Sequence, residues 1–245
     1  MRASNSGMVM LLCLGLLAFA SAARAQETPL AAGPQWPDPG GYGVSASAPR
    51  ILADDFLCTE SGLVTGVSFW GCWAGDQVGR LTGVHLAIYA EDRMEGGGKP
   101  GAVRWMWDSA GIAGSLVEPP SVQGWFDPAL GKPTPADHER YYSYNAAGFA
   151  NPFRQEKDEV YWLAIQVTAE GGLWGWPTSS SQHFQGGAAW ANWNPMLPVE
   201  PQWQALLEPG TGNPLDLAFV ITPEPASLAL VALGSLGLLV RSRRR

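Results

Sequence analysis

The carboxylates are the side chains of this sequence that most readily suggest chemistry. The candidates are Asp54, Asp55, Glu60, Asp76, Glu91, Asp92, Asp158 and Glu159. Two of them set about 5 to 10 Å apart across a cleft could hydrolyse a glycoside. Loop carboxylates could instead bind calcium, with Asp54–Asp55 and Glu91–Asp92–Glu95 as the sites. Solvated positions at loops and strand ends explain most of them, so we predict no catalytic residue, no metal site and no cofactor.

The three histidines do not form a reactive pattern. His85, His138 and His183 lie far apart, and no H-x-x-x-H pair is present to bind a metal. His85 occupies an alternating, strand-like position, which predicts a structural role. His183 lies in a polar stretch and is the strongest functional candidate of the three. The sequence also contains no G-x-S-x-G elbow and no phosphate-binding loop.

Tryptophan is abundant, with 12 residues in the chain. Trp174, Trp176, Trp190 and Trp193 cluster in a stretch rich in Gly, Ser and Asn. Flat indole faces can stack on sugar rings, so this cluster is a candidate glycan-binding surface, with burial in a core as the alternative. Three others, Trp70, Trp105 and Trp162, have strand-like surroundings and are predicted to be core residues.

The N-terminus has the three parts of a secretory signal peptide. A positive charge at Arg2 precedes a short apolar run, and Ala23 and Ala25 then stand in an A-x-A arrangement. We expect residues 1–25 to be removed by signal peptidase after Ala25. An uncleaved N-terminal anchor is the alternative.

The C-terminus carries a motif, an apolar stretch and a basic cluster in that order. Pro223, Glu224 and Pro225 precede the uncharged stretch 226–240, and Arg241, Arg243, Arg244 and Arg245 follow it. As a helix, 226–240 would cover about two-thirds of a hydrocarbon core about 30 Å thick. The arginines would stay on the cytoplasmic side, which places the rest of the chain outside the cytoplasm.

This tail resembles the PEP-CTERM sorting signal that exosortases recognise in Gram-negative bacteria. The resemblance implies that the transmembrane helix 226–240 holds the protein at the inner membrane until it is cut near the Pro-Glu-Pro motif. Exosortase and signal peptidase would then be its processing partners. The final location would be the periplasm, the cell surface or a secreted polysaccharide matrix.

The segment between the two signals is strongly acidic. Residues 26–222 contain nine Lys and Arg against 21 Asp and Glu, a formal net charge of −12. This charge argues against nucleic acid as a partner, because such binding needs a basic face. Cys58 and Cys72 are the cysteines of this segment, and an exported location permits a disulfide worth about 3 kcal/mol. Two free buried thiols are the alternative.

Period-two alternation between turn residues predicts an all-β fold. The clearest alternating runs are 67–70, 84–89, 161–168 and 217–221. Several such strands without helices between them favour a β-sandwich, with a jelly roll as one arrangement. Residues 26–49 are expected to form a loose leader and 50–222 the sandwich domain. Loops are predicted at 95–101, 118–120 and 131–135.

Parts of the body resemble an uncharacterised exported β-domain of planctomycete-type proteins. The matching stretches are 53–58 with 69–73, Lys99-Pro100-Gly101 with Trp105, 161–165, 174–178 through Trp190, and 216–222. This resemblance supplies no catalytic residues. The sequence therefore predicts an exported, exosortase-sorted surface or extracellular-matrix protein without enzymatic activity. A carbohydrate-binding module, with extracellular polysaccharide as its partner, is the first alternative and a glycoside hydrolase the second.

Overall fold

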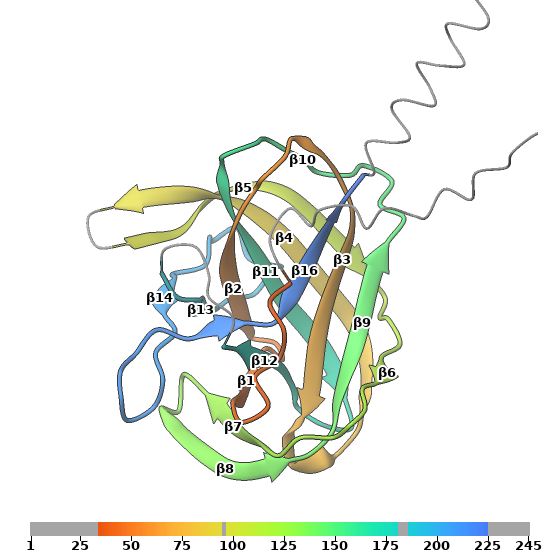
Figure 1. Cartoon of the computed structure of the whole chain (residues 1–245), viewed down its shortest axis with the longest axis vertical. Coiled ribbons are helices and arrows are strands. Elements are labelled where there is room, and N and C mark those ends of the chain that lie inside the picture. The colour runs from red at the N-terminus through yellow and green to blue at the C-terminus, as the bar shows by residue number, and fades with distance from the viewer. Residues whose placement is uncertain (1–33, 95–96, 181–185, 225–245) are drawn as a thin grey trace, which may run out of the picture.

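Alternating side chains build two β-sheets that pack face to face in this computed structural model, which describes residues 34–94, 97–180 and 186–224. Along Val160–Glu170 (β11), Leu163 and Ile165 point between the sheets, whereas Trp162 and Ala164 belong to a separate cluster on the other face. The predicted all-β fold and the sandwich are both confirmed (Figure 1). The jelly-roll arrangement stays a prediction.

The first sheet has ten strands among the described residues, ordered β6-β9-β3-β12-β1-β7-β8, with β10 and β16 also on β3 and β15 on β12. Its strands are β1 Tyr42–Ser45, β3 Gly62–Trp73, β6 Ser115–Leu116, β7 Gln123–Asp127, β8 Lys132–His138, β9 Tyr141–Ala147, β10 Arg154–Gln155, β12 Trp174–Ser179, β15 Asp216–Leu217 and β16 Phe219–Pro223. The short 3-10 helix η1, Ala74–Asp76, follows β3.

The second sheet has six strands in the described part of the chain, ordered β14-β13-β2-β11-β4-β5. Its strands are β2 Arg50–Leu57, β4 Arg80–Met94, β5 Gly97–Ser109, β11 Val160–Glu170, β13 Ala189–Asn192 and β14 Gln204–Ala205. All of its paired strands run antiparallel. β2, β11 and β4 form its centre, so their residues are the most enclosed.

Apolar side chains between the two sheets form the sandwich core. Its largest fully buried members include Phe56, Phe69, Leu86, Ile88, Leu163, Ile165, Trp174, Trp176 and Phe219. Aromatic rings meet edge to face there, as between Trp176 and Phe219 with ring centroids 5.9 Å apart. These contacts join β12 to β16 and so fix the last described strand in the sandwich.

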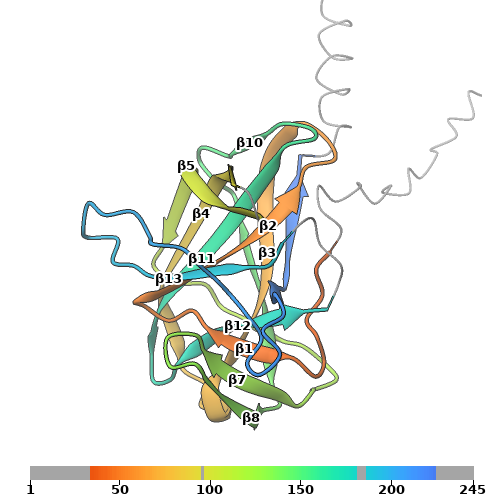
Figure 2. The ribbon, with the colours of Figure 1, turned by 90° about the vertical axis from the view of Figure 1, so that its left-hand side faces the viewer.

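A second buried group, the outer-face cluster, covers the opposite face of the six-stranded sheet. It consists of Ile51, Ala53, Ala87, Tyr89, Trp162, Ala164, Ala189 and Ala191. Trp193 and Trp203, from the segment between β13 and β14, pack against it. Part of this segment projects from the sandwich in Figure 2. The small alanine side chains leave room on this face for the indole rings.

The predicted leader 26–49 and the predicted loop 131–135 both overlap strands of the structure. The expected leader 26–49 contains β1, which lies between β12 and β7 and is buried at Val44. The sandwich therefore begins before residue 50. The expected loop 131–135 includes the start of β8, because β8 is an edge strand, where proline such as Pro133 is tolerated.

The predicted loop 95–101 is also partly strand. Residues 97–101 belong to β5, and Lys99 pairs with Asp92 across the hairpin. The stretch 118–120 is a loop, as predicted.

The two predicted targeting segments lie almost entirely outside the described residues. The residues that lie outside include Ala23 and Ala25 of the signal-peptide site, Pro225, the predicted helix 226–240 and the four C-terminal arginines. Within the part of the chain that the structure describes, no helix has the length and apolarity needed to span a bilayer.

Candidate functional site

Two adjacent aspartates in the middle of the six-stranded sheet form the most unusual polar feature of the fold. Asp54 and Asp55 are neighbours on β2, and both are fully buried. Neighbouring side chains on a strand point to opposite faces. Asp54 is paired in register with Leu163 of the sandwich core, whereas Asp55 is paired with Trp162 of the outer-face cluster. The pair therefore does not face itself across a cleft, as a glycosidase pair would.

Asp54 is held by hydrogen bonds from the backbone. Its carboxylate accepts the N–H of Leu217 at 2.7 Å and that of Asp55 at 3.0 Å. With the side-chain amide of Gln35 turned so that both its ends are satisfied, that amide also donates to Asp54 at 3.0 Å. Burial raises the pKa of Asp54 well above its usual range, and the nearby carboxylates of Asp216 and Asp55 add to the effect. Asp54 thus links β2 to β15.

The carboxylate of Asp55 differs from that of Asp54 in its hydrogen bonding. Neither of its carboxylate oxygens has a hydrogen-bond partner among the described residues. Burial raises the pKa of Asp55 to about 7, with further contributions from the charges of Asp216 and Glu91. Its cross-strand neighbour Trp162 also has an indole nitrogen without an acceptor. An unpaired buried donor and acceptor on neighbouring strands are costly to the fold.

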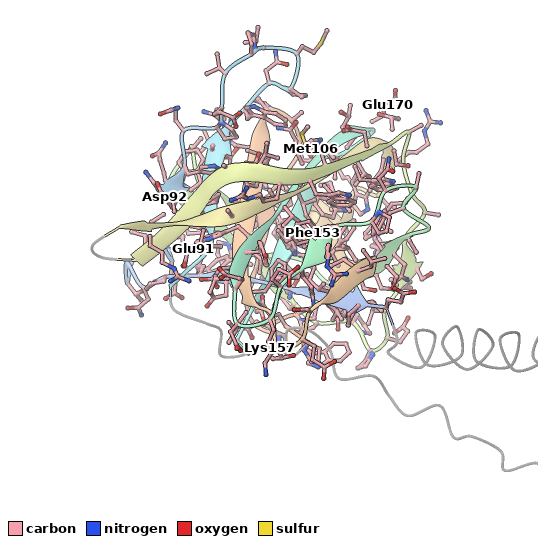
Figure 3. The ribbon with its side chains drawn as sticks, turned by 90° about the horizontal axis from the view of Figure 1, so that it is seen from above. Glu91, Asp92, Met106, Phe153, Lys157 and Glu170 are labelled. Carbon is pink, nitrogen blue, oxygen red and sulfur yellow. The ribbon has the colours of Figure 1, made fainter. Side chains whose placement is uncertain are left out.

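Glu91, which contributes to the raised pKa of Asp55, lies in the β4–β5 hairpin. Figure 3 shows Glu91 and Asp92 together on that hairpin, at the opposite end of the sheet from Glu170. The Glu91 side chain is only 8% exposed and receives an ion pair from Arg93 at 2.8 Å. Asp92 forms a longer ion pair with Lys99, at 3.8 Å. Of these two carboxylates, Glu91 is the one whose charge acts on the buried Asp55.

A pocket of about 340 Å³, the Trp162–Trp203 pocket, opens next to these residues. Its lining comes from β5, β11 and the β13–β14 region and includes Lys99, Trp162, Gly186, Ala189, Trp203 and Gln204. A methyl group at Gly186 would lie 3.8 Å from a carboxylate oxygen of Asp55, so this aspartate lies directly behind the pocket wall. The half-buried Trp203 stands edge to face against Tyr89, with ring centroids 5.6 Å apart.

The pocket joins two edges of the sheet. Lys99 comes from β5 at one edge and Gln204 from β14 at the other, while Trp162 comes from β11 in the middle. Chemically, the pocket offers apolar ring surface, the amide of Gln204 and the ammonium group of Lys99. Such a mixture suits a ligand with both C–H faces and hydroxyl groups.

The calcium alternative finds no support in the described residues, where no group of three or more His, Cys, Asp or Glu side chains is arranged to hold a metal ion. Asp54 and Asp55 point to opposite faces of β2. Glu95 lies outside the described residues.

The four tryptophans predicted to form a glycan surface do not share one plane. Trp174 and Trp176 are wholly inaccessible in the sandwich core, so their assignment to a binding surface is wrong. Their strand β12 lies between β3 and β1 and is covered by the opposite sheet. Trp190 packs on the sandwich core, and Trp193 packs on the outer-face cluster. The indole N–H of Trp193 donates to the carbonyl of Val199 at 3.0 Å.

The tryptophans predicted to be core have different surroundings. Trp162 is buried but belongs to the outer-face cluster. Trp105 is partly buried against the sandwich core and donates to the carbonyl of Asn151 at 2.7 Å. Trp70 is buried outside both clusters, against the exposed Trp36 with ring centroids 5.1 Å apart.

The predicted disulfide is not formed, because Cys58 and Cys72 are both free thiols. Cys58 precedes the start of β3 and Cys72 lies near its end. The ten residue-to-residue steps from Gly62 to Cys72 span roughly 33 Å of extended strand, whereas a disulfide needs Cα atoms within about 7 Å. Burial raises the pKa of Cys58 to about 12 and that of Cys72 well above its usual range, so neither thiol is activated.

The described histidines have structural surroundings. His85 contacts Asp108 at 2.8 Å and lies against the ring of Trp193. His138 is enclosed between Asp137 and Gln123, and burial lowers its pKa despite the nearby acid. His183 lies outside the described residues.

Sequence reasoning missed Trp203, and it predicted the burial of Trp162 correctly without showing that this residue belongs to a second cluster. The alternation along 161–168 already places Trp162 with Ala164 and Gln166, away from Leu163 and Ile165. That pattern was the available signal for a second buried face. Trp203 follows a proline-rich stretch with no periodicity, so only the fold brings it to the pocket.

Comparison with protein families gives two matches. Residues 222–245 match the PEP-CTERM protein-sorting motif, which identifies an exported protein that is sorted to the cell surface and processed by an exosortase. Residues 32–222 match the model described as a domain of unknown function (DUF7901). Searches of the curated proteins and of the solved structures found no match. The chain belongs to the DUF7901 family and carries its domain directly in front of a PEP-CTERM sorting motif.

Proposed function

We propose that the domain is a non-enzymatic surface or extracellular-matrix protein that binds a saccharide in the Trp162–Trp203 pocket. The observation that carries this proposal is the half-buried indole ring of Trp203 in that pocket, together with the exposed polar side chains of Lys99 and Gln204. Sugars present flat C–H faces, which match an aromatic ring, and many hydroxyl groups, which match exposed polar side chains.

The negative charge of the domain limits which classes of sugar we expect to bind in the pocket. The segment 26–222 carries a formal net charge of −12, and Asp55, Glu91 and Asp92 all lie near the pocket. Like charges repel, so uronic-acid polymers are disfavoured partners. Neutral or amino sugars of an extracellular polysaccharide are the ligands that the pocket favours.

Binding to a panel of polysaccharides tests this proposal. Protein recovered from its host is passed over immobilised neutral, amino-sugar and uronic-acid polymers, and affinity for retained polymers is measured by calorimetry. Trp203→Ala should weaken binding at least about tenfold, equivalent to about 1.4 kcal/mol, because it removes ring surface from the pocket. Trp36→Ala, which removes a 56% exposed indole elsewhere on the domain, is the matched control and should bind normally.

The outcomes separate the alternatives. Retention on none of the polymers would exclude saccharide binding, and equal loss in both variants would exclude this pocket. Glycoside hydrolysis is a weaker candidate, because Asp54 and Asp55 point to opposite faces of β2. Release of reducing ends from a retained polymer would overturn the non-enzymatic proposal.

A further inference from the structure

One edge of the six-stranded sheet is a long strand with a free side. β5 is the last strand in the order of this sheet, and among the described residues it pairs with β4 alone. On its other side, the backbone of residues 98–109 forms no hydrogen bond with another described segment. Such a row of unpaired N–H and carbonyl groups is a template on which a further strand can pair.

The two halves of β5 differ in how this edge is protected. Lysine, proline and bulges are the usual means of preventing edge strands from pairing. Lys99 and Pro100 lie in the first half, where the register with β4 also shifts twice. From Trp105 to Ser109 the register is regular, and this stretch contains no proline and no lysine. The second half of β5 is therefore the part that can accept another strand.

Apolar side chains lie on both faces of this second half. Met106 is at its centre and is 57% exposed (Figure 3). Trp105 and Trp107 point to the opposite face, where both are half-buried. There they stand edge to face against Phe149, with ring centroids 4.9 and 5.5 Å from it. A partner strand beside β5 would cover apolar surface on both faces.

The geometry of antiparallel pairing restricts how two copies of β5 can meet. Successive residues of a regular strand direct their backbone groups alternately to its two sides. Residues that face each other must therefore both bond across the pair or both point away from it. For two copies of one strand, this condition holds only when the numbers of the facing residues have an even sum. A pair centred on Met106 meets the condition and places Trp105 opposite Trp107.

The same register brings opposite charges together at both ends. With Met106 facing its own copy, Arg104 of each strand faces Asp108 of the other. Arg104 is exposed and has no ion-pair partner within the part of the chain that the structure describes. The Asp108 side chain is 76% exposed, and it contacts His85 through one carboxylate oxygen, which leaves the other oxygen for the second copy.

The neighbouring registers are less favourable. A pair centred on Arg104 or on Asp108 brings two like charges face to face, which is destabilising. A pair centred on Trp105 or on Trp107 places a charged side chain opposite Met106. The sequence 104–108 is thus complementary to itself in one register.

We propose that two copies of this protein pair through β5, antiparallel about a two-fold axis between their Met106 residues, and so join their six-stranded sheets into one. The interface is isologous, because each copy contributes the same strand, and it closes after two copies. β5 lines the Trp162–Trp203 pocket with Gly98 and Lys99, which lie outside the paired segment 104–108. The pairing therefore does not depend on whether that pocket binds a saccharide.

Charge exchange tests the register. Sedimentation velocity of the protein recovered from its host should show a dimer whose share rises between about 1 and 100 μM. Arg104→Asp places two acids face to face at each end, and it should raise the dissociation constant at least about tenfold. Asp108→Arg should have a similar effect, and the double variant, which restores opposite charges, should return the constant to that of the wild type. Arg80→Asp, at a 75% exposed position on β4, is the matched control and should leave it unchanged.

A cysteine at the two-fold axis tests the contact itself. Facing residues of an antiparallel pair have Cα atoms about 4.5–5.5 Å apart, which a disulfide can bridge. Met106→Cys should therefore give a covalent dimer on oxidation, seen on a non-reducing gel. Met196→Cys, at an 89% exposed position in the segment between β13 and β14, is the control and should stay monomeric. A protein that is monomeric at every concentration would overturn the proposal, as would a dimer that is insensitive to both single charge changes and is not cross-linked by Met106→Cys.

Discussion

The sandwich core and the outer face of the six-stranded sheet both bury tryptophan and aspartate, but they differ in how many of the buried polar atoms form hydrogen bonds. In the core, the indole N–H of Trp176 donates to the carbonyl of Ala218 at 2.7 Å, and Asp54 accepts the N–H of Leu217. In the outer-face cluster, both carboxylate oxygens of Asp55 and the indole nitrogen of Trp162 have no partner in the described part of the chain. The core also leaves one such indole nitrogen, in Trp174, whereas the cluster leaves three atoms in one cross-strand pair.

This difference shows which region of the described chain leaves more of its buried polar atoms without a partner. Each buried polar atom without a partner costs about 1–3 kcal/mol, and a ligand that supplies the partner recovers part of that cost. The sandwich core has little to gain from a ligand, because its rings are packed and inaccessible. The outer-face cluster differs in that the half-buried Trp203 packs on it and lines a pocket.

Removal of a core indole should have the largest effect. Trp176→Ala deletes a fully buried ring and leaves the carbonyl of Ala218 without its donor. We expect the free energy of unfolding to fall by about 3–5 kcal/mol. Urea denaturation measures this change, and Trp36→Ala, at an exposed position, should cost about 1 kcal/mol or less. Similar losses in the two variants would contradict the assignment of β12 to the core.

The next effect depends on pH and concerns Asp55. Its pKa is raised to about 7, so the folded protein keeps a proton that the unfolded chain releases near pH 4. Stability should therefore fall as the pH rises from about 4 to 7, by up to about 4 kcal/mol for a shift of about three units. Asp55→Asn should remove this fall and unfold at a higher temperature than the wild type at pH 8.

An exposed aspartate provides the control for this prediction. Asp158 lies on the surface with a φ of 63°, a conformation that asparagine also tolerates. Asp158→Asn should leave the pH profile unchanged. If Asp55→Asn has the same profile as the wild type, then Asp55 is ionised without penalty and the contrast between the two regions fails.

The sequence alone predicts the strands and the two faces involved in this contrast, but not the residues that cover the outer face. Alternation along 84–89 and 161–168 predicts strands correctly and even separates Trp162 from Leu163. It does not show that the second face is buried, because the covering residues Trp193 and Trp203 come from an irregular segment. Nor does it place Asp54 against β15, since that contact spans more than 160 positions of the chain. Local patterns predict strands and faces, whereas the covering of a face depends on long-range contacts.

A smaller effect is expected at the edge of the outer-face cluster. Trp203 is half-buried and makes its ring contact with Tyr89 from one side of the pocket. Trp203→Ala should lower the free energy of unfolding by about 1–2 kcal/mol, less than half the loss at Trp176. Urea denaturation of the two variants under the same conditions compares their free energies of unfolding directly. A loss as large as that of Trp176→Ala would make the outer-face cluster a second structural core rather than a binding region.

The smallest effect concerns the two thiols. Cys58 packs in the sandwich core, whereas Cys72 lies outside it, where a methyl group at Gly43 would overlap its sulfur and touch His138. Because β3 separates them along its length, no disulfide should contribute to stability. The urea midpoint should therefore be the same with and without dithiothreitol. A midpoint lowered by the reductant, together with a mass two units below that of the dithiol form, would show that the cysteines are bridged and that β3 does not hold them apart.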